Sequence, residues 1–535
     1  MAVLCVDVGT SMVKAVMFDH EGREIKVARQ GTVVHRRGAG QSEQDMYSVW
    51  DAVVYTVRSV VHQVKEPVRA VAITGQGDGC WLVGADGRPT GPAILWNDAR
   101  ASGIVDDWDA NGILEQAYRI NGTLGFPGTS GAIMAWLMQH DPERLRASHK
   151  ALYCTGWIFN RLTGEFAADE SDAASPFLDL RAGEYSAELL EMYGMPWAER
   201  LLPDIRRDGS RIAEISPSVA PELRLRPGIP VVLAPFDIPA TALGIGTIAP
   251  DQACTILGTT LCTDIILDRP ETGGTPAGMT LPSAVEGTYV KSLAAMAGVE
   301  IVSWGMRLMG LDNPSWLSDL AATAEPGAGG LLFHPYLSPA GERAPFRDSQ
   351  ARGALIGLSF EHSRPQIARA LIEGMSYVIR NCLEFGTDDL TDLRLCGGGA
   401  NSALWCQVLA DVTGVPTTRS VDAEIGAKGA FLTALVALGE EPSMADAVGA
   451  YVHARDTFEP EPRTSGIYAE LYQAFLDTGG PVAQQWPTLA ALRAHATPAP
   501  DDAGDADDTD AEAGIADDAG NADEDEAGNG NADAG

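Results

Sequence analysis

The chain has 535 residues, of which 45% are hydrophobic and 21% are charged, enough for two large domains with cores of their own. Its formal net charge of −35 disfavours binding to nucleic acid or to an anionic membrane surface. Composition therefore excludes disorder throughout the chain and favours a soluble protein with neither nucleic-acid nor membrane partners.

The eight cysteines are irregularly spaced and include no Cys-x-x-Cys pair. Such usage is typical of reduced, mostly buried thiols in a cytosolic protein. The first residues reach Asp7 without a basic leader, unlike a signal peptide, and no apolar stretch approaches the length of about 18 residues that a membrane span needs. We expect a cytoplasmic protein.

The first half of the chain predicts short strands that end in glycine or aspartate, with helices between them. The expected strands are 4–8, 13–18, 25–29, 68–74 and 230–237, and the expected helices are 46–64, 132–139, 157–162 and 240–245. Residues 119–131 are expected to form a loop, because glycines are frequent in them. The near-continuous apolar run at 230–237 is typical of a strand buried on both faces.

The turn that follows the first strand is the first candidate site. Asp7 lies near the end of this strand and is followed by Gly9, Thr10 and Ser11. Glycine lets backbone N–H groups approach phosphate, the two hydroxyls can donate to phosphate oxygens, and a carboxylate can hold hydrated Mg²⁺. The alternative is an ordinary β-hairpin turn that requires glycine.

The second half repeats this pattern. A strand at 252–257 ends in Gly258-Thr259-Thr260, and a strand at 393–396 ends in Gly397-Gly398-Gly399, before a helix at 401–413. Closing helices are expected within 434–477. The repetition predicts two similar α/β domains that face one cleft.

The predicted boundary divides the chain into a first domain at 1–248, a second domain at 249–480, and a linker and tail at 481–535. Within residues 501–535, fourteen are Asp or Glu and none is Lys or Arg. Such a segment buries too little apolar surface to fold, so we expect a disordered acidic tail. Solvation is the simplest role for it, with binding of a partner as the alternative.

Further motifs resemble the FGGY carbohydrate kinases, a branch of the actin, Hsp70 and hexokinase superfamily, over roughly residues 3–480. The strongest is similar to the C-terminal signature of that family: Gly353-Ala354-Leu355-Ile356-Gly357-Leu358, then, after seven intervening residues, Gln366-Ile367-Ala368-Arg369-Ala370-Leu371-Ile372-Glu373. Other landmarks are Trp96-Asn97-Asp98-Ala99-Arg100, Thr163-Gly164-Glu165, Ser171-Asp172-Ala173-Ala174, and Tyr336-Leu337 with Gly341-Glu342-Arg343-Ala344-Pro345. The resemblance implies two ribonuclease H-like domains, of the actin and hexokinase ATPase type, around a central cleft.

The resemblance also implies roles for individual residues. Asp237 would accept the proton of the attacking hydroxyl, with a helix cap as its alternative role. Asp7 would hold the Mg²⁺ of ATP through water. Contacts to ATP are implied for Thr10, Ser11, Gly258 and Thr259 at the phosphates, and for Gly397, Gly398, Gly399 and Asn401 beside adenine and ribose.

Substrate choice is expected at Gln76, Gly77 and Asp78 and after Asp237. Xylulose kinases usually have Gln-Met-His-Gly at the first place and Asp-Asn at the second, whereas this chain has Gln-Gly-Asp-Gly and Asp-Ile-Pro-Ala. A carboxylate at Asp78 accepts hydrogen bonds from two hydroxyls but has no donor for a ketone, which favours a polyol. A turn-capping role is the alternative for Asp78.

The combined motifs resemble the erythritol kinase group, so we expect phosphorylation of a small linear polyol such as erythritol. Two lysines frequent in the family are replaced here, by Ile133 and Thr155. Trp81 and Trp96 are candidate walls of the substrate pocket and Gln76 a candidate donor, with a place in the core as the alternative for the two aromatic rings.

Two other functions stay open at this point. One is a ketopentose kinase of the xylulose or ribulose type, and the other is an ATPase-fold protein that hydrolyses ATP alone or senses a sugar without turnover. Dimers are common in the FGGY family, which makes a homodimer an expectation for this chain.

Overall fold

The computed structural model describes residues 2–38, 40–386 and 389–496. Of the described residues, those up to Trp486 form one compact unit, and Pro487–Ala496 fall outside it. The predicted acidic tail at 501–535 lies outside the described residues. Within the described ranges, no helix has both the length and the apolar character to cross a membrane.

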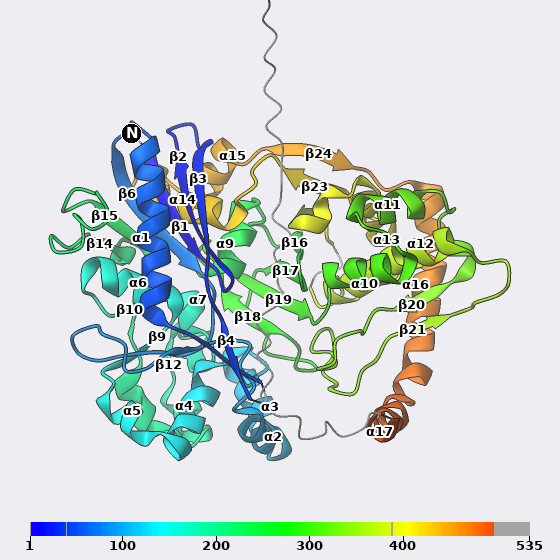
Figure 1. Cartoon of the computed structure of the whole chain (residues 1–535), viewed down its shortest axis with the longest axis horizontal. Helices are drawn as coiled ribbons and strands as arrows, with labels where there is room; N and C mark the ends of the chain where they lie inside the picture. Colours follow the sequence, from blue (N-terminus) through cyan, green and yellow to red (C-terminus); the bar gives the residue numbers. More distant parts are fainter. Residues whose placement is uncertain (1, 39, 387–388, 497–535) are drawn as a thin grey trace, which may run out of the picture. The chain divides into compact units, whose positions relative to one another are not determined.

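The first sheet has six strands (Figure 1). In spatial order they are β14 (Ile212–Glu214), β15 (Pro230–Leu233), β6 (Val68–Gly75), β1 (Ala2–Val8), β2 (Met12–Phe18) and β3 (Glu24–Gly31). The three central strands β15, β6 and β1 are parallel, and β2, β3 and β14 run antiparallel to their neighbours. The carboxyl ends of β1, β6 and β15 therefore meet at one edge of the sheet.

The second sheet has seven strands and repeats this pattern. In spatial order they are β18 (Met279–Pro282), β19 (Tyr289–Ala295), β17 (Leu261–Leu267), β16 (Gln252–Leu257), β22 (Asp392–Cys396), β23 (Thr417–Ser420) and β24 (Ala454–Phe458). Strands β16, β22 and β23 are parallel, and β16 forms an antiparallel hairpin with β17, as β1 does with β2. The predicted pair of similar α/β folds is confirmed.

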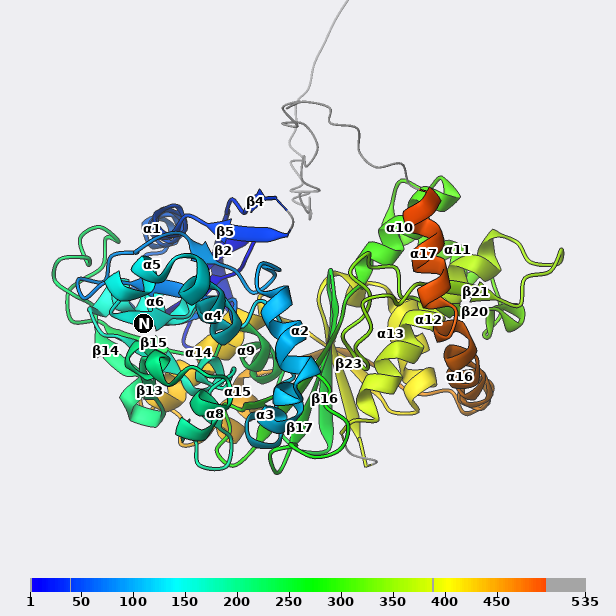
Figure 2. The same ribbon diagram turned by 90° about the horizontal axis from the view of Figure 1, so that it is seen from below.

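Helices cover both faces of the first sheet. Alternate residues of a strand point to opposite faces, so one strand contributes side chains to two cores. Leu4, Val6 and Val8 of β1 pack in a core with helices α1 (Met46–Gln63) and α6 (Cys154–Thr163). Val3 and Cys5 pack on the other face against helix α14 (Ile425–Ala437). Helix α14 also contacts α9 (Asp237–Gly244), so a helix from late in the chain completes the first fold (Figures 1 and 2).

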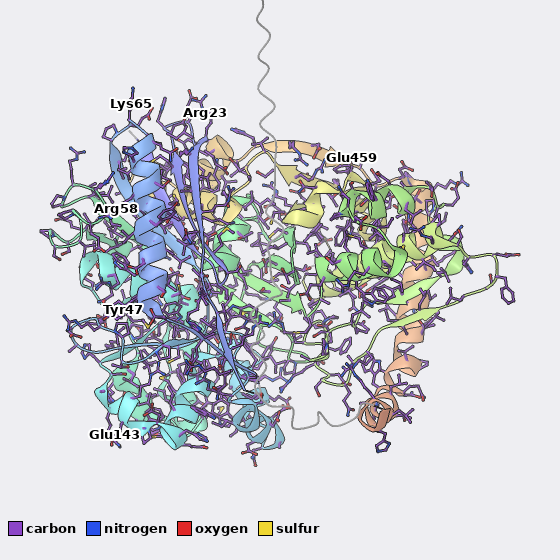
Figure 3. The ribbon with its side chains drawn as sticks, viewed as in Figure 1. Arg23, Tyr47, Arg58, Lys65, Glu143 and Glu459 are labelled. Atoms are coloured by element: carbon purple, nitrogen blue, oxygen red, sulfur yellow. The ribbon has the colours of Figure 1, made fainter. Side chains whose placement is uncertain are left out.

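Helix α1 shows why such segments are helical. Its buried residues include Val49, Val53, Val57 and Val60, which recur every three or four positions, and Asp45 caps its first turn by accepting from Ser48 N. Tyr47 and Arg58 lie on its exposed face (Figure 3).

The other elements are shorter or cover the second sheet. The further helices are α2 (Ser102–Ala110), α3 (Ile113–Asn121), α4 (Ser130–His140), α5 (Pro142–Ala147), α7 (Glu170–Ala173), α8 (Ala187–Met192), α10 (Val299–Met309), α11 (Pro314–Ala322), α12 (Arg364–Leu383), α13 (Ala403–Thr413), α15 (Met444–Tyr451), α16 (Pro462–Ala483) and α17 (Trp486–Ala496). The further strands are β4 (His35–Arg37), β5 (Gln41–Gln44), β7 (Trp81–Val83), β8 (Ala93–Ile94), β9 (Lys150–Leu152), β10 (Ala167–Asp169), β11 (Leu178–Asp179), β12 (Glu184–Tyr185), β13 (Asp204–Arg206), β20 (Leu332–His334) and β21 (Ala354–Ile356).

Two local predictions are confirmed only in part. The expected loop at 119–131 contains the end of α3 and the start of α4, because Gly122 terminates α3 in a left-handed conformation and Thr129 caps α4. The expected closing helices at 434–477 are interrupted by strand β24, whose residues complete an edge of the second sheet.

Candidate active site

A cavity of about 440 Å³ lies between the strand ends of the two sheets. From the first half of the chain it is lined by Thr10, Gly77, Asp78, Trp96, Leu124, Gly125, Phe126, Phe236, Asp237, Ile238 and Thr241. From the second half it is lined by Ile256, Gly258, Thr259, Thr260, Cys262, Gly278, Met279, Ser292, Ala294, Arg343, Ala344 and Arg347. Seven residues predicted for the site are thus brought together: Thr10, Gly77, Asp78, Trp96, Asp237, Gly258 and Thr259.

The Thr10 turn is held by hydrogen bonds from three segments. Thr10 Oγ1 accepts from Trp96 Nε1 and donates to Gln76 Oε1, each at 2.9 Å. Gln76 Nε2 donates to Gln44 Oε1 at 3.0 Å, and Gln44 Nε2 donates to the Thr10 carbonyl at 2.6 Å. The Thr10 hydroxyl proton is therefore engaged, which leaves the backbone N–H groups and the Ser11 hydroxyl as the donors that this turn can offer to a phosphate. Ser11 lies exposed beside it and does not line the cavity.

Asp7 lies next to the last residue of β1 and is not part of the cavity lining. Burial raises the pKa of Asp7, Lys14 opposes that change and Glu424 adds to it. Lys14 Nζ is 2.9 Å from Glu424 Oε2. Among the described residues, no group of three His, Cys, Asp or Glu side chains could hold a metal ion by itself. One carboxylate together with phosphate oxygens and water is the usual way that proteins hold Mg²⁺, and the Asp7 site fits that arrangement.

Asp237 is the first residue of α9, which follows β15 after a short connection. Phe236 occupies the N-cap position and no side chain caps the helix, so the alternative role of Asp237 as a cap is not observed. Burial, followed by the charges of Asp7, Asp264 and Asp78, raises the pKa of Asp237 to about 8, against a hydrogen bond from the Ile238 backbone. A half-buried carboxylate with a pKa near neutrality is suited to accept a proton from a hydroxyl.

Asp78 also lines the cavity and lies in a left-handed turn with φ of 51°. Its Oδ1 is buried and has no hydrogen-bond partner. Burial raises the pKa of Asp78 to about 6, against the effects of the nearby Ser175 hydroxyl and the Arg343 guanidinium. A buried acceptor without a donor is costly, so a ligand hydroxyl at this position would remove the penalty.

The second glycine turn joins β16 to β17. Thr259 is exposed and Gly258 is half-buried, and both line the cavity. A Cβ at Gly258 would meet no atom closer than Thr260 O at 3.5 Å. The free space in front of Gly258 lets a ligand approach the backbone closely.

The third glycine turn follows β22 and does not line the cavity. Gly397 has φ of 84°, and a Cβ there would lie 2.7 Å from the Leu257 carbonyl. A Cβ at Gly399 would lie 2.7 Å from the Trp405 ring, and Asn401 ends the 3₁₀ turn that follows. Close packing on Leu257 places this turn directly beside Gly258.

The comparisons with known proteins identify the family. Residues 2–244 match the N-terminal domain, and residues 253–438 the C-terminal domain, of the FGGY family of carbohydrate kinases. The chain is 32% identical to the erythritol kinase of Brucella abortus over 91% of this chain and 98% of that protein. The chain belongs to the FGGY family of carbohydrate kinases.

Other relatives are close to this kinase. It is 31% identical to the xylulose kinase of Escherichia coli over 82% of this chain and 90% of that protein. A crystal structure of a ligand-bound xylulose kinase from Lactobacillus acidophilus has the same fold, with a TM-score of 0.86 over 91% of this chain and 99% of that chain, at 24% identity. The protein is thus an enzyme that phosphorylates a small carbohydrate, a polyol or a ketose.

Trp81 does not lie on the cavity wall of the kinase. It is fully buried in the core of the first sheet, stacked on Trp157 at a ring distance of 5.6 Å. Because its ring has apolar neighbours on both sides, Trp81 has the place in the core that was the alternative to a place in the substrate pocket. Gln76 is also outside the lining and acts on the cavity through Thr10.

Arg343 lines the cavity and was not among the predicted site residues. Its Nε donates to the Ala294 carbonyl at 2.9 Å, and its guanidinium lies over the Trp96 ring, 5.7 Å from the centroid. It therefore brings a positive charge from the second half of the kinase to the side of the cavity that holds Asp78. The Gly341 to Pro345 landmark was the signal that could have indicated it.

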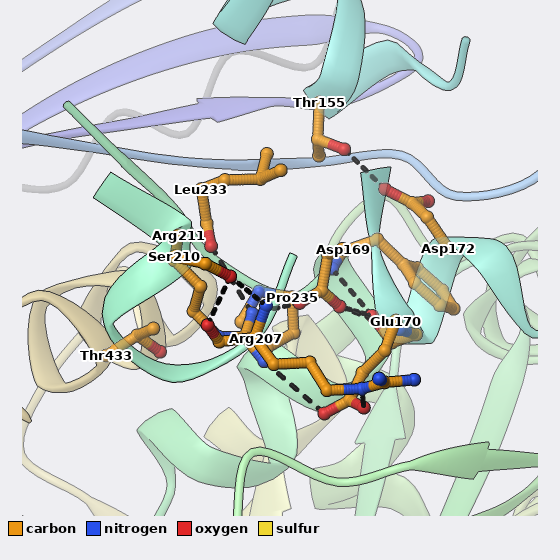
Figure 4. Close-up of polar contacts among 12 residues, drawn as sticks. Thr155, Asp169, Glu170, Asp172, Arg207, Ser210, Arg211, Leu233, Pro235 and Thr433 are labelled. Carbon is orange, nitrogen blue, oxygen red and sulfur yellow. Dashed lines mark hydrogen bonds and ion pairs between the residues drawn. The ribbon is translucent and has the colours of Figure 1, made fainter. Parts of the chain in front are cut away.

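A buried polar network supports the segment that carries Asp237 (Figure 4). Arg211 pairs with Asp169 and donates to the Leu233 carbonyl at the end of β15. Ser171 Oγ accepts from Phe236 N at 3.3 Å. Thr155, one of the two residues that replace a frequent lysine, donates to Asp172, and burial holds the pKa of Asp172 well above its usual range.

Proposed function

We propose that this kinase transfers the γ-phosphoryl group of ATP to a terminal hydroxyl of a small linear polyol such as erythritol. The observation that carries the polyol assignment is Asp78, whose buried Oδ1 has no donor. A polyol presents a hydroxyl donor on every carbon, whereas a ketose has no donor at its carbonyl carbon. The 32% identity to an erythritol kinase supports the same substrate class.

In the proposed mechanism, the polyol binds between Asp78 and Asp237 with its terminal hydroxyl on the Asp237 carboxylate. Asp237 accepts the hydroxyl proton as the oxygen attacks the γ-phosphorus, and the bond from that phosphorus to the bridging oxygen breaks to release ADP. Arg343 stabilises negative charge on the reacting phosphoryl group or on a substrate oxygen beside Trp96. The apolar walls formed by Phe126, Phe236 and Ile238 exclude water, which would otherwise compete as the acceptor.

The nucleotide is proposed to lie along the three glycine turns. Gly258 and Thr259 contact the phosphates together with the Thr10 and Ser11 turn, and Gly397, Gly398, Gly399 and Asn401 border adenine and ribose. Asp7 would hold hydrated Mg²⁺, which would neutralise phosphate charge. The charge of Asp7 raises the pKa of Asp237, and a cation held by Asp7 would oppose that effect.

The alternative is a ketopentose kinase, favoured by the 31% identity to a xylulose kinase. The test is a substrate panel at fixed ATP and Mg²⁺: glycerol, erythritol, threitol, ribitol, xylitol, D-xylulose and L-ribulose. We expect the highest kcat/KM with a tetritol and a phosphomonoester product by mass spectrometry. A tenfold preference for a ketopentose would refute the polyol assignment, and ADP release without a phosphorylated product would refute kinase activity on this panel.

A further inference from the structure

The ring of Phe236 and the backbone of Gly77 occupy the same small volume. A Cβ built on Gly77 would stand 2.3 Å from Phe236 Cδ2 and 2.6 Å from Cε2. Gly77 is not among the residues with positive φ, so its backbone conformation is open to other residues. The ring of Phe236 is therefore what requires glycine at position 77.

Phe236 has little freedom to move away. It is 3% exposed and belongs to a core cluster with Tyr153, Leu178 and Ile266. Its backbone is fixed on both sides, because its N–H donates to Ser171 Oγ at 3.3 Å and its carbonyl accepts from Ala240 N at 3.0 Å. A side chain at position 77 must displace this ring together with the start of α9.

Both residues line the cavity, and each is followed directly by one of its two carboxylates. Asp78 follows Gly77, and Asp237 follows Phe236. The contact between the ring and Gly77 thus joins the segment of the group proposed to hold substrate hydroxyls to the segment of the group proposed to accept the proton. A substrate bound in the cavity can therefore meet this ring, which is part of the lining.

We propose that the contact between Gly77 and Phe236 determines specificity, because the ring limits the cavity to a short linear polyol. The identity of that polyol rests on the proposed function, whereas the coupling between the two positions does not. Removal of the ring would lengthen the cavity, and a side chain at position 77 would be tolerated only after the ring is removed.

The test is a double-mutant cycle with Gly77→Ala, Phe236→Ala and the double variant, each assayed with polyols of three to six carbons and with D-xylulose. We expect Gly77→Ala to lower kcat/KM on the best substrate at least tenfold, and the double variant to recover at least fivefold of that loss. Phe236→Ala alone is expected to raise the ratio of kcat/KM for pentitols over tetritols at least tenfold.

Gly305→Ala is the matched control. A Cβ at Gly305 would lie 2.6 Å from the Leu371 side chain in helix packing far along the chain, and Gly305 does not line the cavity. It is expected to lower the melting temperature without changing the substrate ratio, and Phe236→Ala is not expected to rescue it. Phe236→Leu gives the same comparison if Phe236→Ala does not fold.

A double variant no more active than Gly77→Ala would overturn the proposal, as would a pentitol to tetritol ratio within twofold of wild type in both Phe236 variants. The coupling is measured on whichever substrate the wild-type enzyme uses best. A wild-type preference for a ketose would therefore refute the proposed function and still leave the cycle interpretable.

Discussion

The hairpins at Thr10 and Thr259 have the same topology and different surroundings. In each, a strand of a parallel core turns at glycine and threonine into an antiparallel neighbour. The Thr10 hydroxyl is held by Gln76 and Trp96, whereas Thr259 is exposed. The repeated fold places a turn with glycine and threonine in both halves of the chain. The residues around each turn determine which groups it can present to a ligand.

The two sheets also differ in where their carboxylates lie. Asp7, Asp78 and Asp237 all lie at strand ends of the first sheet, while β16 ends in Leu257 and β22 in Cys396. The second sheet has its own buried carboxylate, Asp264, within β17 and outside the cavity lining. Proton transfer and hydroxyl recognition are therefore expected from the first sheet, and neutral contacts to phosphate from the second.

Asp237→Asn is the change with the largest expected effect. The variant cannot accept a proton, so kcat should fall by about 10²- to 10⁴-fold while nucleotide affinity, measured by calorimetry, stays within threefold. In the wild type, kcat/KM should rise with pH up to about 8, because only the charged form of Asp237 is active. Turnover within tenfold of wild type would contradict the assignment.

The same substitution should stabilise the fold at alkaline pH. The pKa of Asp237 is about 8 in the folded chain and near 4 for an ordinary Asp, so folding favours the protonated form. Wild-type stability therefore falls as pH rises from about 4 to about 8, and Asn escapes that loss. We expect a higher melting temperature for Asp237→Asn at pH 8 and a difference that shrinks toward pH 4.

Asp264→Asn is the matched control in the second sheet. Burial raises the pKa of Asp264 to about 7, so this variant should also gain stability at pH 8. Since Asp264 does not line the cavity, turnover should stay within fivefold of wild type. A loss of turnover as large as that in Asp237→Asn would contradict the proposal that proton transfer depends on the first sheet.

Asp78→Ala is expected to have the next largest effect. Loss of hydrogen bonds to a charged acceptor should lower kcat/KM for the polyol by about 10- to 100-fold, with KM for ATP unchanged. Asp86→Ala, an exposed turn aspartate that accepts from Arg88 N, provides the control with no expected change. Equal losses with polyols and ketoses would argue against a role in substrate choice.

Gly258→Ala tests the phosphate side with a smaller effect. The free chain has room for the new methyl group, whose nearest atom is Thr260 O at 3.5 Å, so stability should not change. The methyl group would stand where a phosphate is proposed to approach, and KM for ATP should rise about tenfold with polyol KM unchanged. Gly466→Ala, on α16 with no atom within 4 Å, is the control. An unchanged KM for ATP would place the phosphates elsewhere.

Local patterns in the sequence were sufficient to predict the repeated sheets. Strands such as 4–8 are apolar on both faces, and their glycine and aspartate ends mark the cavity edge. Contacts between distant segments were not predictable, because they depend on how the sheets come together. The hydrogen bond from Trp96 to Thr10 and the position of Arg343 over Trp96 are of this kind.

Trp81→Phe should have the smallest effect on activity. It tests whether Trp81 belongs to the core or to the wall of the cavity. The smaller ring loses part of the stacking on Trp157, so the free energy of unfolding should fall by about 1–2 kcal/mol, measured by urea denaturation. Trp81 Nε1 is buried without a partner, so no hydrogen bond is lost. kcat/KM for the polyol should stay within twofold. Trp96→Phe should lower kcat/KM for the polyol and change the free energy of unfolding little, because it removes the hydrogen bond to Thr10 at the cavity wall. A raised polyol KM in Trp81→Phe with unchanged stability would return Trp81 to the substrate pocket.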